Sequence, residues 1–208
     1  MTAPGDSISS ERDALRSTLR ALRRRLPARE RRRSANRVAV RLARLPVFSS
    51  ARWIAGYLPF DGELDSLPSM QRAGAAGKNL CLPMIDPVRR GKMTLGHFQR
   101  SGVLLLNRFG ILEPCRRLTT RVPLRQIDIV LMPLVGFDEQ GNRLGMGAGY
   151  YDRFLHRRIR GQWRRPLLVG IAFDLQRAEH IPHEPWDVPM DLIITERRTY
   201  RPRATYTN

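Results

Sequence analysis

Hydrophobic residues in the first 45 positions recur every three or four residues, which is the spacing of one face of a helix. Four leucines between positions 15 and 26 follow this spacing, Ser10 can cap the segment and Pro27 stops it, so we predict a helix over 10–26. A second run with the same spacing starts at Ala28 and stops at Pro46. The chain therefore opens with two predicted helices, whose arginines lie off the apolar stripe.

The pattern then changes to short β-branched and aromatic runs of strand length. Two of them, 127–132 and 167–173, are almost wholly apolar, as expected for strands buried on both faces. Predicted helices over 64–76 and 150–160 alternate with the strands, and a polar loop occupies 113–126. This order predicts an α/β fold: a single domain with a mostly parallel sheet and helices on both faces, in three layers. The predicted strands are 53–58, 79–83, 93–95, 127–132, 167–173 and 191–195.

Three glycines at alternate positions follow one of these strands and precede a predicted helix, within residues 143–152. Glycines let backbone N–H groups approach an anion closely, and the helix N-terminus adds partial positive charge, so phosphate is the expected ligand. The spacing G-x-G-x-G differs from the dinucleotide fingerprint, and Asn142-Arg143 after Gly141 does not complete a Walker loop.

Spacing alone leaves a simpler interpretation open, in which these glycines form an ordinary turn that closes a βα unit. Their neighbours favour a binding site instead. Arg143 supplies a cation, Tyr150 and Tyr151 supply ring faces, and Asp152 supplies an oxygen ligand.

The charge of the chain is strongly basic, with a formal net charge of +18. It contains 35 arginines and two lysines, and the first 50 residues hold 13 of the arginines against four acids. This surface should attract anions. A nucleic-acid-binding module is the alternative from another class, since runs 23–25 and 31–33 are all arginine, but no helix-turn-helix, zinc or aromatic RNA-binding signature accompanies them. A sugar-phosphate or acyl-CoA enzyme on a similar sheet is a second alternative.

The cysteines, the apolar runs and the N-terminal residues indicate in which cellular compartment the protein is expected. Cys81 and Cys115 have neither a CxxC nor a Cys/His ligand spacing, which fits a reducing cytosol without a disulfide framework or zinc site. No apolar run reaches the roughly 18 residues of a membrane span. The N-terminus lacks the features of a secretory signal, and Glu11, Asp13 and Glu30 argue against a transit peptide. We expect a cytoplasmic protein.

The run Arg143-Leu144-Gly145-Met146-Gly147-Ala148-Gly149-Tyr150-Tyr151-Asp152 resembles the signature of the 5-formyltetrahydrofolate cyclo-ligase family, also called 5,10-methenyltetrahydrofolate synthetases. The resemblance continues in order along nearly the whole chain. It includes the basic N-terminal helix, Tyr57-Leu58-Pro59, Gly62-Glu63-Leu64-Asp65, Gly110-Ile111-Leu112-Glu113-Pro114, Gly170-Ile171-Ala172-Phe173 with Gln176, and Asp187 and Asp191 before Thr195-Glu196.

The resemblance implies one cyclo-ligase domain over residues 1–208, with the basic helices of 10–45 packed onto it. It implies an enzyme that uses ATP and Mg²⁺ to convert 5-formyltetrahydrofolate to 5,10-methenyltetrahydrofolate, releasing ADP and phosphate. The formyl oxygen is a poor leaving group, so its phosphorylation followed by attack of N10 explains the need for ATP. We expect a monomer that acts on polyglutamylated reduced folates, without a membrane or nucleic-acid partner.

The resemblance also assigns roles to individual residues. Arg143 and Tyr151 are the expected catalytic residues, and Asp152 and Asp191 are the expected magnesium ligands. ATP is expected to contact Arg12, Arg16, Arg143, Leu144, Gly145, Met146, Gly147, Ala148, Gly149, Tyr150 and Tyr151. The folate is expected to contact Leu58, Glu63, Met146, Gly147, Ala148, Gly149 and Tyr150.

Four positions depart from the family pattern. Arg12 stands where many relatives have Lys, which replaces a point charge by a planar fork. Met146 and Ala148 lie between the glycines where some relatives carry Lys or Gly, so one phosphate contact is expected to be missing. Trp186 stands where His is common, so we expect no catalytic imidazole there.

Overall fold

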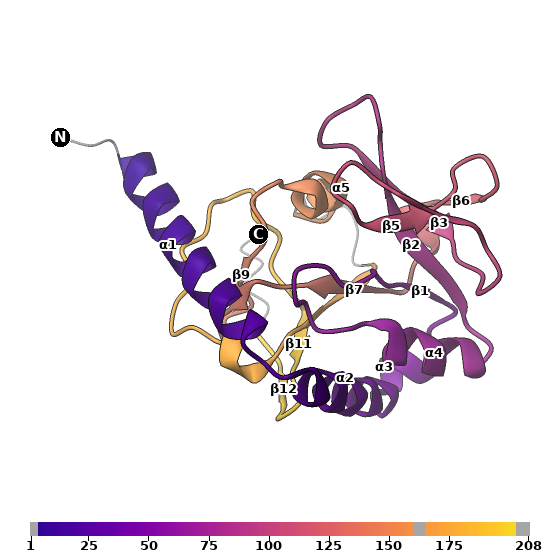
Figure 1. Ribbon diagram of the computed structural model, residues 1–208, viewed down its shortest axis with the longest axis horizontal. Coiled ribbons are helices and arrows are strands. Elements are labelled where there is room, and N and C mark those ends of the chain that lie inside the picture. Colours follow the sequence, from indigo (N-terminus) through magenta and orange to yellow (C-terminus); the bar gives the residue numbers. More distant parts are fainter. Residues whose placement is uncertain (1–3, 160–164, 203–208) are drawn as a thin grey trace.

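The computed structural model of the chain describes residues 4–159 and 165–202 (Figure 1). Its centre is one sheet of eight strands: β1 (Trp53–Ala55), β2 (Asn79–Ile85), β3 (Met93–His97), β6 (Arg121–Val122), β7 (Ile129–Pro133), β10 (Leu167–Ile171), β11 (Leu192–Ile194) and β12 (Thr199–Tyr200). Their order is β12-β11-β10-β7-β1-β2-β3-β6. The inner strands from β11 to β2 are parallel, whereas β12, β3 and β6 pair antiparallel at the edges. The predicted mostly parallel sheet is confirmed.

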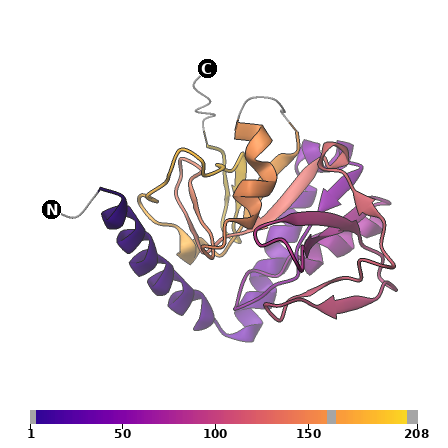
Figure 2. The same cartoon turned by 90° about the horizontal axis from the view of Figure 1, so that it is seen from above.

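Helices cover both faces of this sheet, which confirms the three predicted layers (Figures 1 and 2). On one face lie α2 (Ala28–Ala43), α3 (Pro46–Ser50) and α4 (Leu67–Ala75), and on the other lies α5 (Tyr150–Ile159). No helix of the described residues combines the length and apolar character needed to cross a membrane.

Successive apolar side chains of the inner strands point to opposite faces of the sheet, which explains why helices pack on both faces. Ile129 and Leu131 of β7 pack into the core beneath α2, α3 and α4, whereas Val130 and Met132 pack into the core that includes Leu155 of α5. These four residues of β7 are each at most 2% exposed, so the strand is a continuous apolar run.

The first helix, α1 (Pro4–Arg24), does not cover the sheet. It lies along one end of the molecule, against the short strand β8 (Gly136–Phe137) and the 3-10 helix η2 (Asp174–Gln176). Leu19 packs there with Val135, Leu144 and Ile181. The two N-terminal helices therefore pack in different ways: α2 against the sheet and α1 against the loops at its end.

Several boundaries differ from the predictions for local reasons. The first helix starts at Pro4 rather than Ser10, since proline suits a first helical turn. The loop predicted over 113–126 instead contains the end of β5 (Leu112–Pro114), all of β6 and a 3-10 turn. β5 pairs with β4 (Leu104–Leu106), and β8 pairs with β9 (Arg143–Leu144); these strands are too short for sequence periodicity to reveal. The predicted end of the last long helix, residue 160, lies outside the described residues.

The sheet reverses its direction of growth between β1 and β7. From β1 the chain adds β2 and β3 on one side, whereas from β7 it adds β10 and β11 on the other. Loops leaving the carboxyl ends of β1 and β7 therefore diverge, and this opens a crevice of the kind in which α/β proteins bind ligands. The turn after β1 and the segment after β7 border this crevice.

Candidate active site

A cavity of about 690 Å³ occupies the crevice between the loops that follow β1 and β7. Its wall continues along the end of β2, the turn around Phe109 and the start of α5. Arg16, Leu144 and Asp191 do not line it. The predicted site residues that do line it are Arg12, Leu58, Glu63, Arg143, Gly145, Met146, Gly147, Ala148, Gly149, Tyr150, Tyr151 and Asp152.

Residues 145–149, here called the glycine loop, connect β9 to α5 along the cavity wall. Gly147 and Gly149 have φ values of +94° and +63°, a left-handed conformation that L side chains rarely adopt. A Cβ atom at Gly149 would also lie 2.7 Å from Nη1 of Arg153. The backbone path of this loop therefore requires glycine at positions 147 and 149.

Substituting Gly147 by Ala should lower the free energy of unfolding by about 1 kcal/mol, because alanine must then adopt the left-handed conformation. Space is not the obstacle, since the nearest Arg16 atom would lie 3.8 Å from the Cβ atom of that alanine. Urea unfolding measures the change. Gly74→Ala within α4 is the control, and there we expect a gain in stability; equal stability of Gly147→Ala and the wild type would contradict the backbone requirement.

Arg143 and Asp152 form an ion pair between the start of β9 and the first turn of α5. Asp152 Oδ1 also accepts a hydrogen bond from Val188 N at 3.2 Å. The Arg143 side chain is 6% exposed, and its Nε finds no hydrogen-bond partner among the described residues. A buried N–H group without a partner is costly, so a ligand in the cavity can supply what this donor lacks.

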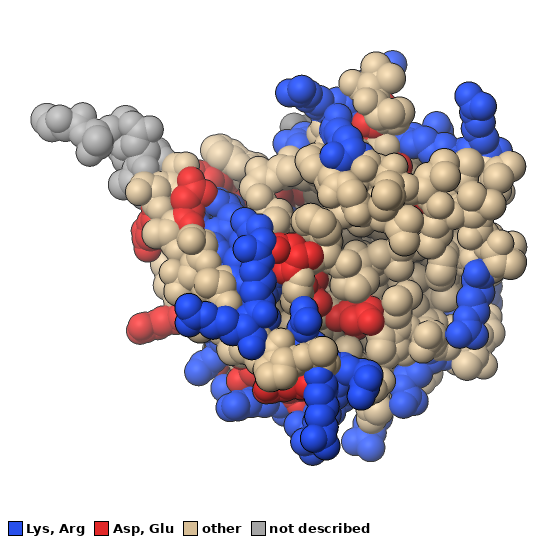
Figure 3. Space-filling view, in the orientation of Figure 1, with Lys and Arg blue, Asp and Glu red and all other residues tan. Residues whose placement is uncertain are grey.

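Of the two α1 arginines expected to bind phosphate, Arg16 lies beside the glycine loop and Arg12 lines the cavity. Arg16 Nε donates to Gly145 O at 2.9 Å, and its guanidinium also pairs with Asp13. Arg12 Nη1 lies 2.7 Å from Oδ2 of Asp187 on the opposite rim. Figure 3 shows basic side chains along α1 next to acidic ones in the adjoining hollow. Both arginines have protein partners, so their contact with phosphate remains a prediction.

The turn after β1 contributes Leu58 and Glu63 to the cavity. Glu63 Oε2 accepts a hydrogen bond from Phe60 N at 3.1 Å. Burial raises the pKa of Glu63 to about 7, against the opposing effect of the Arg23 charge. This carboxyl group therefore changes charge near neutral pH.

Tyr150 and Tyr151 differ in their surroundings. Tyr151 Oη is buried and has no hydrogen-bond partner among the described residues, and burial raises the pKa of this phenol. Tyr150 lies at the rim, where its hydroxyl contacts Arg108 and its ring meets Phe109 edge-on at a centroid distance of 6.0 Å. Tyr151 is thus a donor at the cavity wall, and Tyr150 is part of an aromatic rim.

Sequence reasoning missed the rest of this rim. Phe60, Phe109 and Trp186 line the cavity with exposed fractions of 38%, 44% and 65%. Exposed aromatic side chains around a hollow are typical of ligand sites, but their sequence context does not separate them from core residues.

Leu144 and Asp191 lie away from the positions expected for ligand contacts. The Leu144 side chain is fully buried against Leu19 of α1, where it anchors the glycine loop. Asp191 precedes β11 at the amino end of the parallel strands, and its Oδ2 accepts a hydrogen bond from Leu168 N at 2.6 Å. The cavity lies at the carboxyl ends, so the structure does not bring Asp191 together with Asp152. Asp191 connects two strands instead.

Comparisons with known proteins identify the family of the chain. The model of the 5-formyltetrahydrofolate cyclo-ligase family matches residues 8–196. The 5-formyltetrahydrofolate cyclo-ligase of Escherichia coli K12 is 35% identical over 182 residues, covering 88% of this chain and 98% of that protein, and its Haemophilus influenzae counterpart is 33% identical over 189 residues, covering 89% and 98%. The solved 5,10-methenyltetrahydrofolate synthetase of Aquifex aeolicus superposes with a TM-score of 0.78 at 33% identity, covering 95% of each chain. The chain belongs to the 5-formyltetrahydrofolate cyclo-ligase family.

Proposed function

We propose that this enzyme converts 5-formyltetrahydrofolate and ATP to 5,10-methenyltetrahydrofolate, ADP and phosphate. The observation that carries the proposal is that one cavity joins the glycine loop to Glu63 and an apolar, aromatic wall. The first feature suits a polyphosphate and the second suits a pteridine. The family relatives bear the name of this ring closure.

The reaction needs positioning and charge neutralisation more than a protein nucleophile. The formyl oxygen attacks the γ-phosphorus of ATP and ADP leaves, which gives an iminium phosphate at N5. N10 then attacks the formyl carbon, the C–O bond breaks, phosphate departs and N10 gives up its proton. Both steps require the two substrates to lie side by side, which the shared cavity allows.

Arg143 and Tyr151 are the residues we assign to the reacting groups. Both residues line the cavity, and Arg143 Nε and Tyr151 Oη are buried donors that lack partners among the described residues. A donor that is already fixed in place stabilises charge as it develops on the transferring phosphoryl group. The backbone N–H groups of the glycine loop, Arg12 and Arg16 are assigned to the remaining phosphate oxygens.

Asp152 is the residue we assign to magnesium. Among residues 4–159 and 165–202, no three His, Cys, Asp or Glu side chains gather into a metal-binding group. Magnesium at nucleotide sites commonly takes one or two carboxylates, with phosphate oxygens and water as its other ligands, so Asp152 on the cavity wall fits that requirement. The bound ion supplies neutralisation of phosphate charge.

The glutamate tail of the folate is expected to leave through the rim near Tyr150. Arg108 and Arg153 are exposed there, and the Arg153 guanidinium lies over the Tyr150 ring. With a net charge of +18, the protein suits polyglutamylated substrates. We propose that it acts on them as a monomer in the cytoplasm.

The direct test is to incubate the purified protein with 5-formyltetrahydrofolate and MgATP and to follow the near-ultraviolet absorption of the methenyl product. We expect product and ADP in equal amounts, with none when ATP or magnesium is omitted. Product without ATP consumption, or no product at all, would refute the proposal. Steeply salt-dependent binding to arbitrary duplex or RNA would favour the nucleic-acid alternative.

Substituting Glu63 by Gln should raise the KM for folate by about tenfold or more, because a half-buried charged acceptor for the pteridine N–H groups is lost. The wild type should bind folate more weakly as the pH falls below about 7, since burial raises the pKa of Glu63 to about 7 and the protonated group accepts fewer hydrogen bonds. This acid limb should vanish in the variant. Steady-state kinetics from pH 6 to 8.5 measure it, with Glu139→Gln, an exposed partner of Arg177, as the control.

A further inference from the structure

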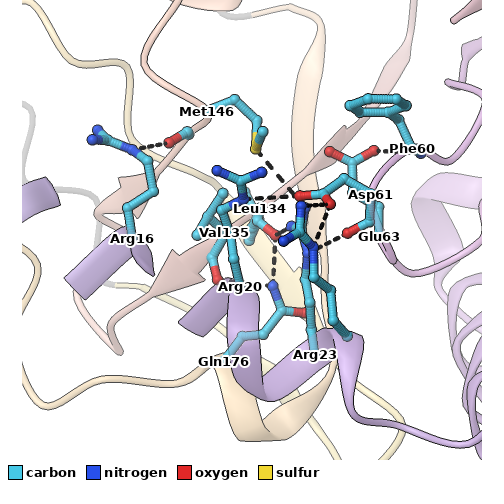
Figure 4. Close-up of polar contacts among 12 residues, drawn as sticks. Arg16, Arg20, Arg23, Phe60, Asp61, Glu63, Leu134, Val135, Met146 and Gln176 are labelled. Atoms are coloured by element: carbon cyan, nitrogen blue, oxygen red, sulfur yellow. Dashed lines mark hydrogen bonds and ion pairs between the residues drawn. The ribbon is translucent and has the colours of Figure 1, made fainter. Parts of the chain in front are cut away.

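Arg23 is a fully buried arginine on α1, with an exposed fraction of 0%. Its Nε donates to Asp61 O at 3.0 Å, its Nη2 lies 3.2 Å from Asp61 Oδ2, and its Nη1 donates to Leu134 O at 3.2 Å (Figure 4). Gln176 Nε2 donates to the same Leu134 carbonyl at 2.6 Å. One guanidinium therefore joins α1 to the turn after β1 and to the segment after β7, the two sides of the crevice.

Arg23 also reaches the glycine loop. Its Nη2 lies 3.8 Å from Sδ of Met146, which lines the cavity between the loop's glycines. The family resemblance marked Met146 as a departure that lacks a charge. In this chain the thioether instead contacts a buried cation.

The turn held by Arg23 has an unusual backbone. Asp61 has a φ of 52°, the one positive value among the non-glycine residues that the structure describes, and Gly62 follows with 76°. Such a conformation persists where surrounding contacts over-determine it. The Asp61 carboxylate pairs with Arg20, Arg23 and Arg24, whose side chains are 32%, 0% and 55% exposed. Of these three, only Arg23 is withdrawn from solvent.

The charges of Arg23 and Asp61 act on the neighbouring Glu63 carboxyl group. Arg23 from α1 lowers the pKa of Glu63, whereas Asp61 of the same turn raises it, and burial dominates both effects. Tyr57 after β1 and Tyr151 of α5 are the other titratable groups that face Glu63, and burial raises the pKa of each. Arg23 is thus the cation that opposes protonation of Glu63.

We propose that Arg23 is a positioning residue that holds the turn of residues 61–63 against the glycine loop and thereby holds Glu63 in place for folate binding. The proposal rests on the proposed role of Glu63. Arg23 lies outside the lining of the cavity, so it acts through Glu63 rather than on the substrate.

The test compares variants with opposite expected effects. Carbon-13 NMR of the Glu side chains in the ligand-free chain gives the titration midpoint of Glu63, identified by the signal missing in Glu63→Gln. Arg23→Gln should raise this midpoint by about one pH unit, because the opposing cation is removed. Asp61→Asn should lower it, since asparagine tolerates the left-handed conformation and no longer competes for Arg23. Arg23→Lys should restore most of the wild-type value.

Kinetics provide the second readout. In each variant, the pH at which the KM for folate begins to rise should shift together with the NMR midpoint of Glu63. Relative to the wild type, kcat at high pH should change less than the KM at low pH. Arg24→Gln, which removes a more exposed partner of Asp61, is the matched control and should leave the Glu63 midpoint unchanged.

Two results would overturn the proposal. One is an unchanged Glu63 midpoint in Arg23→Gln, and the other is a shift in the same direction in Arg23→Gln and Asp61→Asn, which is what general loosening of the turn would give. If Arg23→Gln does not fold, Asp61→Asn still decides the proposal, because its midpoint must fall. The NMR titration needs no substrate, so its failure is distinct from failure of the proposed function, which appears as wild-type protein without methenyl product.

Discussion

Arg143→Met should lower kcat by about 10²- to 10³-fold, which is the usual cost of removing one fixed donor from a site of developing charge. Arg143 lines the cavity, its side chain is almost wholly buried between β9 and α5, and its Nε has no hydrogen-bond partner among the described residues. Methionine keeps much of the volume and loses the charge and the donors. Single-turnover measurement of the methenyl product at saturating ATP and folate separates this loss from weaker binding.

Two controls make this experiment specific. Arg177→Met removes an exposed arginine that pairs with Glu139 outside the cavity lining, and its turnover should remain that of the wild type. Arg143→Lys should recover only part of the loss, because an ammonium group lacks the planar fork that reaches both Asp152 and a ligand. Wild-type kcat in Arg143→Met with the fold intact would remove Arg143 from the reaction.

Asp152→Asn should lower kcat by about 100-fold while the fold remains intact, because asparagine keeps the shape but loses the charge. The carboxylate pairs with Arg143 and accepts a hydrogen bond from Val188 N. It is also the proposed magnesium ligand. Circular dichroism and thermal unfolding check the fold, and turnover is measured over a range of magnesium concentrations.

The magnesium dependence distinguishes the two roles of Asp152. If Asp152 holds the ion, the magnesium concentration needed for half-maximal turnover rises in Asp152→Asn and excess magnesium restores part of the rate. If Asp152 only orients Arg143, that concentration stays the same while kcat falls. Asp191→Asn should leave the magnesium dependence unchanged, since Asp191 lies at the amino ends of the parallel strands and the cavity lies at their carboxyl ends.

The parts of the structure that the sequence predicted well depend on local patterns. The apolar runs of β7 and β10 and the glycine loop are each recognisable within ten residues, because backbone geometry and burial impose them directly. Glu63 came from the family resemblance alone, since an acid in a Gly-Glu-Leu-Asp turn otherwise resembles a surface residue.

The parts that were missed depend on distant contacts. Arg23 is one of many arginines on α1, and its burial follows from a partner 111 positions away in Leu134. The sequence does not show that Asp191 lies outside the cavity lining, because an acid before a strand suits a metal or a backbone N–H equally well, and only the structure places it at the amino ends of β10 and β11. Strands β8 and β9 have two residues each, too few for alternation to appear.

The position of α1 has a consequence for how the enzyme is completed during synthesis. Its arginines meet partners that are translated much later: Gly145 follows Arg16 by 129 residues, and Asp187 follows Arg12 by 175. Arg12 and Arg16 of α1 therefore lack these partners until the later segments have been synthesised. A nascent chain stalled before Asp187 would contain Glu63 and the glycine loop but would lack the Arg12–Asp187 ion pair, so its ligand affinity should rise only after Asp187 has been added.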